Sequence, residues 1–190
     1  MRSSENRRRA VAAAACAALL LAACTSAPSA EPVRVQDTAC PVAGPALGPH
    51  QVSLAQQLQH GALASPLFAA GIAPSGIAAC RVEGAPGAVS VDYRATNGNE
   101  LHVRRDDTIE YTEWEARFVA PPAQATPLLQ QAERAAFGAG GCGIDWQHPE
   151  TRSAGGGSEV RFRGDTCQCQ AIVRRDAAGR VVALGLRSTC

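Results

Sequence analysis

The sequence contains no lysine, although arginine is common: all 18 of its Lys and Arg residues are arginine. A phosphate-binding P-loop, a Schiff-base enzyme and a Ser-Lys dyad all use the amine of a lysine side chain, so these classes are excluded. Aromatic residues make up only 4% of the chain, which is too few for a platform that stacks sugars or bases. These shortages argue against several enzyme classes and against nucleic-acid recognition.

The short motifs that mark many catalytic sites are missing as well. No H-E-x-x-H, G-x-S-x-G or C-x-x-C is present, which leaves zinc proteases, serine hydrolases and thioredoxin-type reductases without support. The histidines stand in unrelated contexts, at positions 50, 60, 102 and 148. We therefore expect no metal and no cofactor, and we do not expect an enzyme.

The beginning of the chain has the three parts of a secretory signal. Arginines 2 and 7–9 precede an apolar run over 10–21, which at 1.5 Å per residue is too short to span a bilayer core of roughly 30 Å. The segment Leu21-Ala22-Ala23-Cys24 resembles the lipobox of bacterial lipoproteins. The resemblance implies that residues 1–23 are removed, that Cys24 is acylated, with palmitate among its lipids, and that the protein faces the periplasm from the outer membrane.

Removal of residues 1–23 changes the charge of the chain. Four arginines and Glu5 leave with this segment, so the formal charge falls from +1 to −2. This balance gives no electrostatic reason to expect nucleic acid as a partner. Residues 24–38 contain prolines and little apolar character, which predicts a flexible tether, and 39–190 then form one domain.

Cysteine usage indicates a framework of disulfides. Besides Cys16 in the signal and Cys24, an even number remains for an exported domain, namely Cys40, Cys80, Cys142, Cys167, Cys169 and Cys190. If Val173 lies opposite Val182, one register satisfies the hydrophobic patterns of both strands near the C-terminus and brings Cys167 next to Cys190. Elimination then leaves Cys142 with Cys169 and Cys40 with Cys80. The alternative, a metal site of Cys167 and Cys169 with Cys142 or His148, has the wrong spacing for zinc.

Hydrophobic periodicity predicts an α+β domain with an antiparallel sheet of about six strands and one main helix. The main helix covers 127–137, with Glu133 on its polar face, and a shorter one covers 54–60. The strands are expected over 89–95, 101–105, 108–119, 160–162, 167–174 and 181–188. The third of these changes face near Thr112, which calls for a bulge. A weak αβββ duplication, 50–120 and 124–190, is a second interpretation.

The functional prediction is a membrane-anchored binding or accessory module for another envelope protein, which uses an exposed sheet face or the loop over 143–158. One alternative is a hydrolase of an envelope polymer. On a strand Glu113 and Glu115 would point the same way about 7 Å apart, a separation that overlaps the geometry of paired glycosidase carboxylates. Another alternative is a purely structural surface lipoprotein.

Overall fold

The computed structural model describes residues 40, 47–139 and 141–190. These residues form three helices and eight strands. The helices are α1 (Pro49–Ala64), α2 (Pro66–Gly71) and α3 (Ala125–Phe137). The strands are β1 (Ile77–Ala85), β2 (Ala88–Ala95), β3 (Glu100–Asp106), β4 (Tyr111–Arg117), β5 (Glu150–Ala154), β6 (Gly157–Arg163), β7 (Gln170–Arg175) and β8 (Val181–Thr189).

The strands form one antiparallel sheet with the order β1-β2-β3-β4-β8-β7-β6-β5. Each half of the chain supplies a helical segment and then four consecutive strands, and β4 and β8, the last strands of the two halves, pair at the centre. The two halves therefore share an element order of helices followed by four strands. The duplicated unit that the sequence suggests has only three strands, so it is one strand too short.

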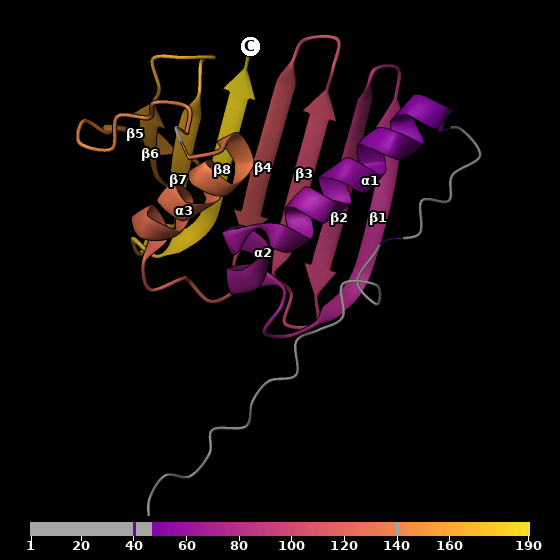
Figure 1. The fold of residues 1–190 in the computed structure, drawn as a ribbon. Helices are drawn as coiled ribbons and strands as arrows, with labels where there is room; N and C mark the ends of the chain where they lie inside the picture. The colour runs from indigo at the N-terminus through magenta and orange to yellow at the C-terminus, as the bar shows by residue number, and fades with distance from the viewer. Residues whose placement is uncertain (1–39, 41–46, 140) are drawn as a thin grey trace, which may run out of the picture. The chain divides into compact units, whose positions relative to one another are not determined.

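All three helices lie on the same face of the sheet (Figure 1). Alternate residues of the strands point toward them and form the hydrophobic core, including Val91, Tyr93, Leu101, Val103, Leu184 and Leu186. The ring of Tyr93 packs edge-on against Phe68 of α2, and burial raises the pKa of its hydroxyl to about 12. The helices thus shield one face of the sheet from water.

Helix α1 is longer than the predicted helix over 54–60. It begins at Pro49, whose fixed φ suits a first helical position, and the backbone N–H of Gly48 donates to Gln51 Oε1 at 3.0 Å. Gly61, which follows the predicted helix directly and is a residue type that often ends helices, lies within α1. An added Cβ there would stand 3.4 Å from the Trp114 ring. Here a glycine permits close packing rather than a helix stop.

The expectation of about six strands was wrong because two edge strands were missed. Strand β1 has no regular apolar alternation, and all five residues of β5 are exposed. An edge strand with little burial leaves a weak hydrophobic signal. The expected loop over 143–158 is also partly wrong, because its end forms β5 and the start of β6. Gly155 and Gly156, with φ of 53° and 85°, form the tight turn of this hairpin.

The predicted strand over 108–119 also begins later than expected. A turn precedes β4, in which the Asp106 carboxylate accepts hydrogen bonds from the backbone and the hydroxyl of Thr108. Ile109 lies in this turn and is 55% exposed. From Tyr111 onward, β4 pairs with β3 without a register shift. The apparent change of face is therefore a turn, and no bulge is required.

Three disulfides join Cys40 to Cys80, Cys142 to Cys169, and Cys167 to Cys190. These are the pairs expected from the sequence. The β7–β8 register differs from the expected one by two residues, with Val173 opposite Leu184. Because a shift of two keeps every side chain on its face, the inward residues remain the same.

Candidate functional site

The face of the sheet opposite the helices is the main candidate for a functional surface. We call it the open face and define it by the strand residues that alternate with the core residues. Its central row crosses the whole sheet through residues that pair in register, which are Arg81, Asp92, His102, Glu115, Gly185, Ile172, Arg161 and Glu150. Charged side chains dominate this row and its two neighbours.

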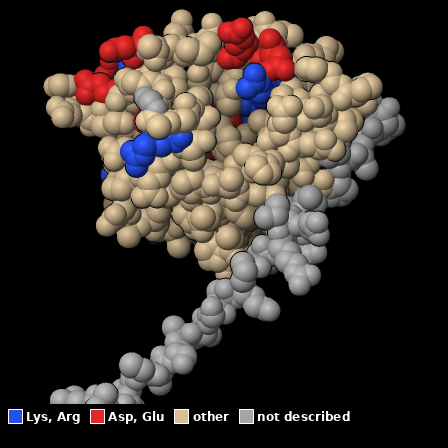
Figure 2. All heavy atoms as spheres, viewed as in Figure 1, with Lys and Arg blue, Asp and Glu red and all other residues tan. Residues whose placement is uncertain are grey.

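The helix side is different in composition. Helices α1 and α2 contain no Asp, Glu, Lys or Arg, and α3 contains only Glu133 and Arg134. Figure 2, viewed from the helix side, shows a surface that is mostly uncharged, with charged groups gathered near its upper rim. The strands thus direct most of their ionisable side chains away from the helices.

Glu115 and Glu159 are connected across the centre of the open face by one arginine that both bind, Arg174. Arg174 on β7 places Nη1 3.0 Å from Glu115 and Nε 3.0 Å from Glu159. To reach Glu115 on β4 it passes over β8, which presents only Ala183 and Gly185 between them. The network therefore depends on two small residues of the central strand.

Further arginines complete this network. Arg117 Nε lies 2.9 Å from Glu115, and Arg161 pairs with Glu159. Burial raises the pKa of each carboxyl group, but hydrogen bonds and positive charge from the arginines outweigh it, so the pKa of both glutamates is lowered. Both carboxylates are therefore held ionised.

Glu113 forms a separate pair on the same strand as Glu115. Arg187, its partner across the β4–β8 ladder, places Nη2 2.7 Å from Oε1. The neighbouring Tyr111 lies under the guanidinium of Arg104, 5.8 Å from the ring centroid. Burial raises the pKa of the Tyr111 hydroxyl to about 12, with a further contribution from a hydrogen bond to Glu113.

A hollow of about 770 Å³ occupies the first half of the open face. Its lining includes His102 on β3, flanked in register by Asp92 and Glu115. His102 Nδ1 lies 2.6 Å from Asp92 Oδ1. This hydrogen bond raises the pKa of His102 against the opposing effect of burial, with further support from the charges of Asp92, Glu113 and Glu115. The acidic neighbours of His102 thus favour its protonated form.

The structure places both members of the predicted carboxylate pair on the open face, each beside arginine. Glu113 and Glu115 do share the open face, and both line the hollow. However, each is bound by arginine, and the pKa of Glu115 is lowered, whereas a general acid needs a raised pKa. The hydrolase hypothesis remains a prediction, and the lowered pKa of Glu115 makes this residue unsuitable as the general acid.

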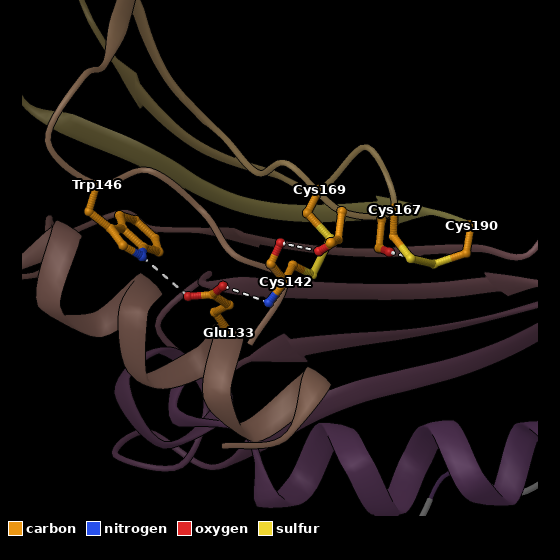
Figure 3. The surroundings of a disulfide bond; sticks show 8 residues. Glu133, Cys142, Trp146, Cys167, Cys169 and Cys190 are labelled. Carbon is orange, nitrogen blue, oxygen red and sulfur yellow. Dashed lines mark hydrogen bonds between the residues drawn. A yellow bond between two sulfur atoms is a disulfide. The ribbon is translucent and has the colours of Figure 1, made fainter. Parts of the chain in front are cut away.

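Glu133 on α3 lies beside the two disulfides of the C-terminal half of the chain (Figure 3). This carboxylate is 5% exposed and accepts hydrogen bonds from the backbone of Cys142 at 2.8 Å and from Trp146 Nε1 at 3.2 Å. It ties the segment after α3 to the helix. Cys142, Cys167 and Cys169 are all in disulfides and so offer no thiolate, and His148 pairs with Asp145 at 2.7 Å.

Other expected features lie outside what the structure describes or add no site. The lipobox-like segment over 21–24 and the expected tether over 24–38 fall outside the described residues. Within the described ranges, no helix has the length and apolar composition needed to cross a membrane, and no cluster of three or more His, Cys, Asp or Glu side chains is arranged to hold a metal ion.

The arginine network was not expected from the sequence. Its signal is the recurrence of Arg and Glu at alternate positions, such as Glu113, Glu115 and Arg117. The links across β8 require the strand order, which alternation does not contain. Comparisons with known protein families, with curated proteins and with solved structures give no match. The geometry is thus the basis for a functional proposal.

Proposed function

We propose that the protein is a binding or accessory module of the cell envelope, which holds another envelope protein against its open face. The observation that carries the proposal is the asymmetry of the sheet. Its helices cover one face, while the other presents an ordered array of charges around a hollow of about 770 Å³. A rigid sheet keeps such side chains in fixed positions, which lowers the entropic cost of binding.

The lipobox supports the envelope as the place of action. Acylation of Cys24 would anchor the domain to the outer membrane, and residues 24–38 would let it move over the periplasmic side. Replacement by Cys24→Ser should release the protein from the membrane fraction while its three disulfides form as before. Unchanged membrane fractionation would show that Cys24 is not the anchor.

Site-specific photo-cross-linking in intact cells tests the binding surface. A photoreactive residue at Gln170, on β7 and on the open face, should give a discrete product with another envelope protein. The matched control is Gln131, an exposed residue of α3 on the helix side. Equal products from both positions, or none from Gln170, would contradict binding through the open face. The absence of any product would favour the alternative of a purely structural surface lipoprotein.

A hydrolase that uses Glu113 and Glu115 is the second candidate, because both carboxylates line the hollow. The double variant E113Q/E115Q separates this candidate from a binding module. Loss of hydrolysis of an envelope polymer, with the cross-link from Gln170 retained, would support the enzyme. Unchanged hydrolysis would eliminate it.

A further inference from the structure

Charges on the part of the open face that runs from β4 to β5 are arranged in two levels. The side chains of Glu113, Glu115 and Glu159 are only 15%, 13% and 8% exposed. The arginines above them are more accessible, and their side chains are 29–65% exposed: Arg117, Arg152, Arg161, Arg163, Arg174 and Arg187. We call these residues the arginine layer. The acids form its base and the guanidinium groups its surface.

We propose that the arginine layer docks an acidic surface of a protein partner through the carboxylates of its Asp and Glu side chains. This inference rests on the proposed function and identifies the chemistry of the partner. The layer extends over β4, β8, β7, β6 and β5. It therefore offers a broad surface rather than a single pocket.

The arginines retain hydrogen-bond donors for such a partner. A guanidinium carries five N–H groups in a planar fork. Arg117 uses Nε toward Glu115, and Arg163 uses Nη2 toward Glu150. Within the described part of the chain, the other N–H groups of these two side chains have no acceptor. Because the buried glutamates already fix the orientation of several of these groups, a carboxylate can bind without first ordering them.

The same arrangement favours an acidic protein over a membrane or a nucleic acid. The three glutamates beneath the layer and the exposed Glu150 neutralise four of its six positive charges, so its long-range attraction for a polyanion is reduced. Recognition must then come from short-range, directional hydrogen bonds. A folded acidic surface can present carboxylates at fixed positions, which matches the fixed positions of the guanidinium groups.

Binding to two synthetic peptides tests the proposal. One contains Asp, Glu, Gly and Ser, and its counterpart replaces the acids by Asn and Gln. Backbone amide NMR shifts of the chain from residue 25 onward report where each peptide binds. We expect the acidic peptide to shift amides of β6, β7 and β8 and to bind at least tenfold more tightly than its neutral counterpart. Binding of both peptides with equal affinity would overturn the proposal.

Variants of exposed arginines assign the binding to the layer. Arg117→Gln and Arg163→Gln leave Glu115 and Glu150 with a second arginine each, Arg174 and Arg152, so the fold should survive. The double variant should bind the acidic peptide about tenfold more weakly. The lysine double variant should recover part of the affinity. Arg134→Gln, an exposed position of α3, is the control and should bind as the unchanged chain does.

The remaining outcomes distinguish binding through the open face from recognition of an acidic partner. If the cross-link from Gln170 forms but neither the peptide nor the arginine variants have an effect, the acidic partner is ruled out and the binding module stands. If the cross-link also fails, both proposals fall. Tighter binding to phosphatidylglycerol vesicles or to heparin than to the acidic peptide would replace the protein partner by a membrane or a polyanion.

Discussion

The covered face and the open face of the sheet are built from the same strands, since alternate residues point to each. On β4, Trp114 and Ala116 face the helices while Glu113 and Glu115 face outward. The covered face is stabilised by removal of apolar surface from water. The open face shields its outward residues by other means: Ile172 is only 2% exposed there, as expected where aliphatic stems of arginine cover an apolar neighbour.

The two faces of the sheet contribute differently to stability and to binding. Apolar packing under the helices contributes most of the folding free energy, because each buried aliphatic side chain is worth about 1.5–3 kcal/mol. Paired charges near the surface contribute about 0–1 kcal/mol each. The extensive pairing on the open face is therefore hard to explain by stability alone. A surface that orders arginines for a partner accounts for it.

The largest effect should come from the covered face. Leu184 on β8 is fully buried, so Leu184→Ala should lower the free energy of unfolding by about 2–5 kcal/mol through lost burial and a cavity. Val182→Ala, on the same strand at a position 36% exposed, should change it by less than about 0.5 kcal/mol. Denaturant titration measures both. Similar losses at the two sites would mean that the helices do not seal this face.

Glu133 is an exception on the covered face, because it is an acidic residue buried among mostly apolar side chains. Glu133→Ala should lower the free energy of unfolding by about 2–3 kcal/mol, because it leaves the Cys142 N–H and the Trp146 indole N–H without their acceptor. Arg134→Ala, at the next position but exposed, should be nearly neutral. Thermal unfolding compares the stability of the two variants. If Glu133→Ala did not lower stability, water would have replaced the carboxylate as acceptor.

Glu133 also shows a limit of sequence analysis. Helical periodicity places it on the polar face of α3, yet it is buried because the segment from Cys142 to Trp146 folds back over it. Alternation identified β2 and β3 and predicted the inward residues, because a strand with one buried face has a period of two. It could not identify β1 and β5 at the edges, where burial is slight.

The candidate site was less predictable than the core for a related reason. Glu113 and Glu115 were recognised as neighbours on one strand, but their partners Arg187 and Arg174 are far along the chain. Their meeting depends on β4 lying beside β8, and no local pattern encodes that pairing. Arg174 additionally needs the space above Ala183 and Gly185, which only the register supplies.

On the open face, Glu159→Gln should have an intermediate effect of about 1–2 kcal/mol, because Arg161 and Arg174 lose a shielded partner. The pKa of Glu159 is lowered, so its contribution is present above the unfolded pKa of about 4.3 and is lost as pH falls through the folded pKa. The difference between the variant and the unchanged chain should therefore narrow in acid. Denaturant titrations at neutral and acidic pH measure this.

Glu150 provides the matched control for Glu159. It also pairs with two arginines, Arg152 and Arg163, but its side chain is 47% exposed. Glu150→Gln should change the free energy of unfolding by less than about 0.5 kcal/mol at any pH, because water screens its pairs. If the two variants behaved alike, shielding of the acids beneath the arginine layer would not matter for stability.

The smallest effect is expected at His102. Its pKa is raised by the hydrogen bond to Asp92, so this pair stabilises the fold fully below the unfolded pKa of about 6.5 and loses that effect as pH rises through the folded pKa. With both side chains partly exposed, the contribution to the free energy of unfolding should stay below about 0.5 kcal/mol.

An effect of this size is too small for stability measurements, but NMR titration of the His102 ring measures its titration midpoint directly. Asp92→Asn should lower its midpoint, whereas Glu83→Gln, on the same face but paired with Arg81, should not. An unchanged midpoint in Asp92→Asn would mean that charges on the open face are not held in fixed pairs, which removes the ordering on which a preformed binding surface depends.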